Sequence, residues 1–177
     1  MVKFRRTKAI FLDRDGILNE TLIKNNLPTS PKNITELKVN FFLRDILQDL
    51  KSVFFLICVT NQPEVGRKKF NKKDVDEIND YIQDYFSLDD LLCCYHANDG
   101  ECNFRKPKIG MLNHSKKKFG ISLENSIVIG DRWKDIDMGN QAKCKTIFVD
   151  YSYNEKLKSR PHVIINNIKN LKKILNV

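Results

Sequence analysis

Short apolar runs alternate along this chain with stretches in which apolar residues recur every three or four positions. The runs at 53–59 and 9–12 are unbroken, and a third, at 126–129, is apolar after its first residue. Runs of this kind are typical of parallel strands that are covered on both faces. Shorter runs predict further strands at 91–95, 146–149 and 163–165.

Helical spacing fills the segments between these runs. Asn40 is placed to cap a helix whose inner face carries Leu43, Ile46, Leu47 and Leu50. Further helices are predicted at 71–86, at 107–119 with Pro107 as the opening residue, through 136–142, and at 168–175. Alternating strands and helices predict an α/β fold, a doubly wound parallel Rossmann-like sheet with helices on both faces. No repeat or linker divides the chain, so we expect a single domain over residues 1–177.

Polar side chains follow three of the predicted strands at the point where each strand ends. The clusters are Asp13-Arg14-Asp15, then 60–62 (Thr-Asn-Gln), then 130–132 (Gly-Asp-Arg). In a parallel α/β sheet the strand ends of one kind lie along one edge, and ligands bind there. The three clusters therefore predict a binding or catalytic site at that edge.

The first cluster holds two carboxylates, Asp13 and Asp15, followed by Gly16. Glycine lets the backbone turn sharply, so that both carboxylates can converge beyond the strand. Carboxylates that close repel each other unless a cation or a proton lies between them. The pair suits Mg²⁺-assisted chemistry on phosphate, although an acidic turn without chemistry is the alternative when the pair is considered alone. The convergence of three polar strand ends favours chemistry.

Composition restricts the class of protein. The 177 residues carry a formal net charge of +9, but the basic residues are dispersed, and no basic ladder interleaved with aromatic residues suggests nucleic-acid binding. The five cysteines are an odd number in a domain large enough to fold without disulfides, which indicates a reducing compartment, the cytoplasm by default. No apolar stretch is long enough to span a membrane.

A polar segment punctuated by Pro28 and Pro31 predicts a surface flap, at about residues 17–35.

Four motifs occur in a characteristic order: FLDRDGILN at 11–19, VTNQ at 59–62, RKPK at 105–108 with Gly-Met at 110–111, and IGDRWKDID at 129–137. This order resembles the haloacid dehalogenase superfamily of phosphohydrolases. More narrowly, it is similar to the small capless branch that includes D-glycero-D-manno-heptose 1,7-bisphosphate phosphatase and the histidinol-phosphate phosphatase domain. The resemblance covers about residues 8–150 and implies a haloacid dehalogenase-like fold without a separate cap domain.

The resemblance also implies roles for individual residues. Asp13 would be the nucleophile that forms an aspartyl-phosphate, and Asp15 would be the general acid and base. Thr60 and Lys106 would complete the catalytic set by binding the phosphoryl oxygens. Mg²⁺ would be held by Asp13, Asp131 and the main-chain carbonyl of Asp15. The substrate-binding residues would be Asn61, Arg105 and Arg132, while Asp135 would cap a helix or support the site.

The loop at about residues 93–107 departs from the pattern of this branch. Relatives carry Cys-x-His and then Cys-x-Cys, which form a closed tetrahedral zinc site. Here Cys94, His96 and Cys102 match three ligand positions, but Phe104 occupies the fourth. Two alternatives stay open. Either Zn²⁺ binds these three residues with water, Cys93 or Asp99 as a fourth ligand, or the loop is metal-free and held by packing.

The resemblance implies a phosphatase, a Mg²⁺-dependent phosphomonoesterase that acts on a small phosphorylated metabolite in carbohydrate metabolism. A sugar bisphosphate, of the heptose type, is the first candidate substrate. The alternatives are a histidinol-phosphate phosphatase, a polynucleotide 3′-phosphatase, and a non-enzymatic phospho-accepting regulatory or degenerate binding module. We expect a monomer that contacts neither membrane nor nucleic acid.

Overall fold

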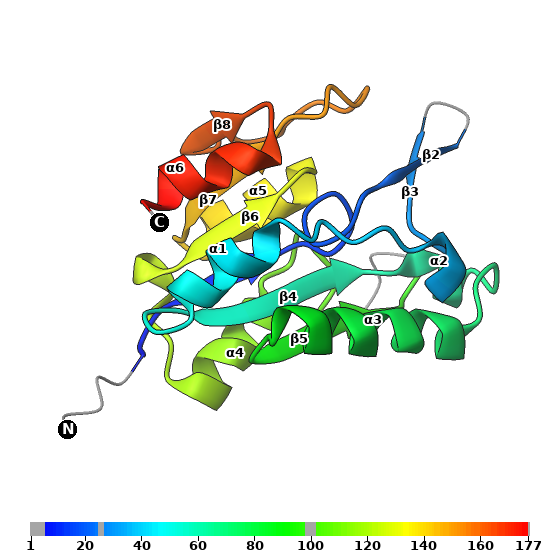
Figure 1. Cartoon of the computed structure of the whole chain (residues 1–177), viewed down its shortest axis with the longest axis horizontal. Helices are drawn as coiled ribbons and strands as arrows, with labels where there is room; N and C mark the ends of the chain where they lie inside the picture. The colour runs from blue at the N-terminus through cyan, green and yellow to red at the C-terminus, as the bar shows by residue number, and fades with distance from the viewer. Residues whose placement is uncertain (1–5, 25–26, 98–101, 177) are drawn as a thin grey trace.

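The computed structural model describes residues 6–24, 27–97 and 102–176. Its centre is a parallel six-stranded sheet with the order β5-β4-β1-β6-β7-β8 (Figure 1). The strands are β1 (Ala9–Leu12), β4 (Phe55–Asn61), β5 (Asp90–Cys94), β6 (Ile127–Gly130), β7 (Lys145–Val149) and β8 (Val163–Ile165). β1, the strand that precedes the acidic pair, lies between β4 and β6, the two strands that precede the other polar clusters. The predicted parallel sheet is confirmed.

Helices cover both faces of this sheet, as the doubly wound prediction requires. On one face lie α1 (Leu43–Leu50), α3 (Lys72–Phe86) and α6 (Leu171–Leu175) (Figure 1). On the other face lie α4 (Gly110–Phe119) and α5 (Trp133–Gln141). The short helix α2 (Pro63–Gly66) follows β4, and 3-10 turns occupy Ile34–Glu36, Leu123–Asn125 and Ile168–Asn170.

The core is divided by the sheet because successive side chains of a strand point to opposite faces. In β1, Ile10 and Leu12 belong to the cluster beneath α1, α3 and α6, whereas Ala9 and Phe11 belong to the cluster beneath α4 and α5. All four side chains are fully buried. Apolar burial on both faces fixes β1 rigidly, so the residues that follow it leave the sheet at a defined place.

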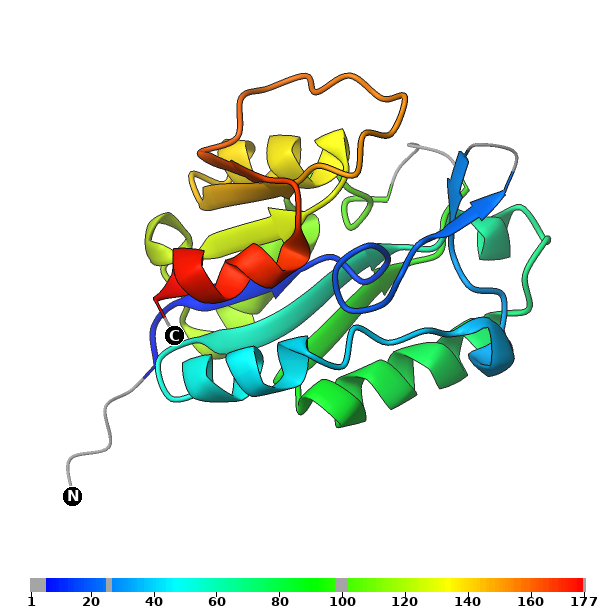
Figure 2. The same ribbon diagram turned by 45° about the horizontal axis from the view of Figure 1, so that its top comes forward.

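A two-stranded antiparallel hairpin projects from the sheet edge where the polar clusters lie (Figure 2). Its strands are β2 (Leu22–Lys24) and β3 (Leu27–Thr29), within the segment predicted as a flap. The described residues form no separate cap domain over this edge.

Two predicted helix starts are wrong. Helix α1 has Phe42 as its N-cap, and Asn40 instead donates a hydrogen bond of 2.7 Å from its side chain to the carbonyl of Ile17. Helix α4 begins at Gly110 rather than at Pro107, because the preceding loop folds back and Gly110 N donates to Asn103 O at 3.1 Å. A Cβ atom at Gly110 would lie 2.1 Å from that carbonyl oxygen, so the turn requires glycine.

In the part of the chain that the structure describes, every helix is too short or too polar to cross a lipid bilayer.

Candidate active site

A cavity of about 420 Å³ opens at the carboxyl ends of β1, β4 and β6. Asp13 follows β1 directly, and its N–H donates to Ile129 O of β6 at 3.0 Å. The predicted convergence of the three strand-end clusters is observed, since residues of each cluster line the cavity. The lining comprises Asp13, Asp15, Thr21, Pro28, Thr29, Ser30, Asn61, Pro63, Glu64, Arg67, Phe70, Arg105, Lys106, Asp131, Arg132, Lys134, Asp135 and Glu155.

Lys106 joins two carboxylates at the floor of the cavity. Its Nζ lies 2.8 Å from Asp13 Oδ1 and 2.6 Å from Asp135 Oδ1, and it donates to Val59 O at 2.9 Å. Burial lowers the pKa of Lys106, but the charges of Asp13 and Asp135 outweigh burial and raise it above the usual value. Lys106 is therefore a permanent cation beside Asp13, suited to stabilising negative charge.

Asp15 is held by four side chains. The Arg14 guanidinium donates to its carboxylate at 3.1 Å through Nη2, and Asn19, Ser30 and Gln62 donate at 3.0, 2.8 and 2.8 Å. Burial acts to raise the pKa of Asp15, but Arg14 and these hydrogen bonds outweigh it and bring the pKa below its usual value. The carboxyl group is thus held in one orientation at the cavity wall.

Three buried carboxylates, Asp13, Asp131 and Asp135, each offer an oxygen within 4.8 Å of the others. Burial and then repulsion from Asp135 raise the pKa of Asp13 to about 7, and burial and repulsion from Asp13 raise that of Asp131 well above its usual range. Asp131 Oδ1 is buried, and no described residue gives it a hydrogen bond. An orphaned carboxylate oxygen in an oxygen-rich cluster fits a hard divalent cation such as Mg²⁺.

Gly16 is required by the position of Asp131. Its φ is 85°, and a Cβ atom there would lie 2.1 Å from Asp131 Oδ2.

We expect Gly16→Ala to lose roughly 1–2 kcal/mol of unfolding free energy through backbone strain and also to lose Mg²⁺ binding, because Asp131 must move. Calorimetric Mg²⁺ titration and urea unfolding measure both effects. Gly120→Ala is the matched control: it shares a positive φ, of 68°, but ends helix α4, so it should lose stability only. Unchanged Mg²⁺ affinity in Gly16→Ala would contradict this account.

Of residues 60–62, Asn61 is the one in the cavity lining, and the three side chains mainly hold other residues. Asn61, predicted to bind substrate, lines the cavity, accepts from Lys106 N at 3.0 Å and donates to Lys106 O at 3.1 Å. Thr60 is 1% exposed, and its hydroxyl accepts from Gln62 at 2.9 Å. Asn61 thus fixes the main chain of Lys106, and Gln62 links Thr60 to Asp15.

The predicted arginines both line the cavity. Arg105 donates to His96 O at 2.8 Å, which connects it to the cysteine-containing loop. The Arg132 guanidinium forms a bidentate ion pair with Glu155, at 2.6 and 2.9 Å. The Asp135 carboxylate accepts a hydrogen bond from Arg132 N at 3.1 Å, which confirms that Asp135 caps helix α5. Sequence reasoning missed the other basic residues of the lining, Arg67 and Lys134.

Sequence reasoning also missed the residues that hold Asp15. Arg14 gave a local signal, since an arginine between two aspartates at the end of a buried strand has carboxylates in reach. Ser30 gave none, because the flap brings it from 15 residues away, and Gln62 comes from 47 residues away.

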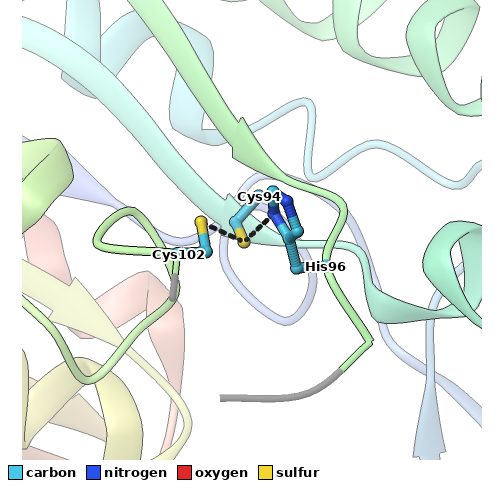
Figure 3. Close-up of side chains that lie close together, drawn as sticks. All are labelled: Cys94, His96 and Cys102. Atoms are coloured by element: carbon cyan, nitrogen blue, oxygen red, sulfur yellow. Dashed lines mark hydrogen bonds between the residues drawn. The ribbon is translucent and has the colours of Figure 1, made fainter. Parts of the chain in front are cut away.

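The side chains of Cys94, His96 and Cys102 point toward one another (Figure 3). Cys94 Sγ lies 3.6 Å from His96 Nδ1 and 3.5 Å from Cys102 Sγ. The three predicted ligand positions are therefore assembled in one place, within 4.8 Å of one another. Their soft donors and spacing are compatible with Zn²⁺.

Among the described neighbours, neither Cys93 nor Phe104 supplies a fourth ligand. Cys93 precedes Cys94 on β5, so its side chain points to the opposite face, where it contacts Tyr95 and Asn79. Asp99 lies outside the described residues. Phe104 packs against the core cluster beneath α4, with its ring 5.6 Å from that of His114.

Phe104→Cys should increase zinc affinity markedly, because a thiolate would complete the tetrahedral set. Bound zinc should then raise the thermal midpoint, since it binds the folded state. The zinc-free variant should be less stable than wild type by about 1–3 kcal/mol, because the ring leaves the core. Zinc content and thermal midpoint, measured on protein purified without a metal-binding tag, check this expectation.

Phe104→Ala is the matched control, because it loses the same packing without gaining a thiol. Stoichiometric zinc in the wild type would show that another group completes the site. Equal zinc content in both variants would show that the loop does not bring position 104 to the cluster.

Comparison with known proteins agrees with this geometry. A family model described as HAD-hydrolase-like matches residues 103–171. The chain is 35% identical over 145 residues to the D-glycero-beta-D-manno-heptose-1,7-bisphosphate 7-phosphatase of Helicobacter pylori (strain ATCC 700392 / 26695), with 78% of this chain and 80% of that protein covered. It is 34% identical over 179 residues to the D-glycero-alpha-D-manno-heptose-1,7-bisphosphate 7-phosphatase of Campylobacter jejuni, with 97% and 95% covered.

The fold is shared with a solved structure, the D,D-heptose 1,7-bisphosphate phosphatase from B. bronchiseptica complexed with magnesium and phosphate. The TM-score is 0.78 at 21% identity, with 96% of this chain and 98% of that chain covered. The two sequence relatives match 78% and 97% of the chain. This chain therefore belongs to the haloacid dehalogenase superfamily, as a phosphatase of the capless branch that contains the heptose-1,7-bisphosphate 7-phosphatases.

Proposed function

We propose that this protein hydrolyses the 7-phosphate of a D-glycero-D-manno-heptose 1,7-bisphosphate in a Mg²⁺-dependent reaction. The observation that carries the proposal is the contact of Asp13 with Lys106 beside Asp15, in a cavity whose lining includes Arg67, Arg105, Arg132 and Lys134. In a bisphosphate substrate, one phosphate group would react with Asp13, and these cationic side chains would bind the second phosphate group.

In the proposed reaction, Asp13 attacks phosphorus, so that an O–P bond to its carboxylate forms while the bond from phosphorus to the sugar oxygen breaks. Lys106 and the N–H of Arg14, which donates to Asp13 Oδ1 at 2.7 Å, hold the attacking carboxylate in place. Asp15 gives a proton to the departing sugar oxygen. The negative charge of the bound phosphate raises the pKa of Asp15 from the lowered value that it has in the free site, so that it can carry this proton. Asp15 then takes a proton from the water that attacks the aspartyl-phosphate, which releases inorganic phosphate and restores Asp13.

Asp13 and Asp131 would hold Mg²⁺, together with the main-chain carbonyl of Asp15, while Asp135 fixes Lys106. When bound, Mg²⁺ supplies positive charge between the carboxylates and the phosphate, so that two anionic groups can approach. The orphaned Oδ1 of Asp131 and the raised pKa values of Asp13 and Asp131 support this assignment.

We further propose that residues 1–177 act as one domain, in which the flap at 17–35 and the loop at 93–107 shape the substrate site. Ser30 of the flap contacts Asp15, and the carbonyl of His96 in the loop contacts Arg105. We assign the protein to the cytoplasm, because all five cysteines carry free thiols.

Phosphate release in Mg²⁺ from four substrates tests this function: the two anomers of the heptose bisphosphate, histidinol phosphate, and an oligonucleotide with a 3′-phosphate. The heptose bisphosphate should give the highest kcat/KM, and its product should retain the 1-phosphate. Preference for histidinol phosphate would reassign the substrate. Preference for the oligonucleotide, with activity that falls steeply with salt, would indicate a polynucleotide phosphatase. No release from any of them would favour a non-enzymatic module.

A further inference from the structure

Arg14, between the two aspartates of the site, is completely buried, with 0% of its surface exposed. An arginine has only donors and stays charged, so a buried one needs acceptors that hold it in place. Asp15 accepts from the Nε and Nη2 side of the guanidinium at 3.3 and 3.1 Å. The other edge, Nη1, donates to Asn79 Oδ1 at 2.8 Å. Asn79 lies on helix α3 and is 4% exposed.

The orientation of the Asn79 amide is determined by its neighbours. Because Arg14 can only donate, the oxygen of the amide must face it, and the Nδ2 group is left to donate to Tyr95 Oη at 3.3 Å. The Tyr95 hydroxyl in turn donates to Asp76, which also accepts from Lys72 at 2.6 Å. From Arg14 to Asp76 the hydrogen bonds therefore all run in one direction, and Asp76 accepts at the end.

This network joins distant parts of the fold. Asp76 and Asn79 are three residues apart on α3. Tyr95 directly follows β5 and stands between the loop residues Cys94 and His96. Arg14, Asn79 and Tyr95 thus each form a hydrogen bond to a residue on another element. The cavity lining includes none of the network residues Arg14, Asn79, Tyr95 and Asp76.

We propose that Asn79 is a positioning residue for Asp15, acting through the Arg14 guanidinium. This inference rests on the proposed acid–base role of Asp15. Without the Asn79 oxygen, Nη1 of the buried guanidinium has no hydrogen-bond acceptor among the described residues, and the guanidinium must turn toward other acceptors. The Asp15 carboxylate accepts hydrogen bonds from the same planar guanidinium. A turn of the guanidinium therefore moves the carboxyl group away from the departing oxygen.

A leaving-group comparison tests this role. The 7-phosphate of the heptose bisphosphate leaves as an alkoxide that needs a proton, whereas p-nitrophenolate leaves without one. Because kcat/KM covers only the steps up to the first irreversible one, the ratio of the two kcat/KM values reports proton donation and excludes the later attack by water. A general loss of folded protein lowers both values equally and leaves the ratio unchanged.

Asn79→Leu, which is similar in size but has no polar atoms, should lower the alkyl-to-aryl ratio roughly tenfold. Tyr95→Phe keeps both polar groups of Asn79 and removes the hydroxyl that orients them, so the ratio should fall about threefold. This second variant also covers the case in which Asn79→Leu does not fold. Ile82→Val, a buried apolar change on the same helix, is the matched control and should leave the ratio at the wild-type value.

The inference is overturned if neither variant changes the ratio, or if Ile82→Val changes it equally. Asp15→Asn separates the inference from the function on which it rests. If Asp15→Asn lowers the ratio but Asn79→Leu and Tyr95→Phe do not, only the positioning role is wrong. If Asp15→Asn itself leaves the ratio unchanged, the acid–base assignment is wrong and the role of Asn79 is wrong with it.

Discussion

Asp13→Asn should abolish turnover, with kcat reduced by roughly four orders of magnitude or more, the scale expected when the nucleophile of a covalent mechanism is removed. An amide oxygen is too weakly nucleophilic to attack phosphorus, so no aspartyl-phosphate can form. The fold should persist. Lys106 keeps its contacts with Asp135 and the Val59 carbonyl, and the amide reduces repulsion among three buried carboxylates.

Phosphate release and the thermal midpoint measure both parts of this expectation. The matched control is Asp137→Asn, the same chemical change on helix α5, where the carboxylate accepts from Ser159 at 2.6 Å and does not line the cavity. It should retain wild-type kcat. Mass spectrometry of the Asp13→Asn protein guards against conversion of the asparagine back to aspartate. Substantial activity in a sample that is free of such conversion would rule out the aspartyl-phosphate mechanism for this chain.

Removal of Mg²⁺ should abolish activity, and added Mg²⁺ should restore it, because the buried carboxylates otherwise repel both one another and the phosphate. Mg²⁺ should also stabilise the fold. At 100 times its Kd, a ligand that binds only the folded state contributes about 2.7 kcal/mol, which for a domain of this size raises the thermal midpoint by roughly 5–10 °C.

Asp131→Asn should lose most of this Mg²⁺-dependent shift, because the orphaned carboxylate oxygen disappears. The metal-free variant should be more stable than the metal-free wild type at neutral pH. A carboxyl group whose pKa is raised by folding weakens the folded state above its ordinary pKa, and Asp131 is such a group. Thermal melts with EDTA and with Mg²⁺ measure both differences, and Asp137→Asn again serves as the control. Full activity after exhaustive chelation, or an unchanged Mg²⁺ shift in Asp131→Asn, would remove Asp131 from the metal site.

The amino-acid sequence by itself predicted the sheet and the place of the site. The apolar run of β1 is buried on both faces, and its side chains alternate between two core clusters. This pattern is visible in sequence because the period of a strand depends on consecutive residues. The convergence of Asp13, Asn61 and Asp131 followed from the rule that parallel strands end at one edge.

The tertiary structure alone decided which side chains hold one another. Asn79 lies 65 residues from Arg14, and Lys106 lies 29 residues from Asp135. Asn40 lost its predicted capping role to a contact with the Ile17 carbonyl, which lies 23 residues away. Polar partners of this kind are chosen by packing between elements, and burial makes each unmatched donor or acceptor unfavourable. Local patterns carry no information about such pairs, because the distance that matters is the distance in space after the core has formed.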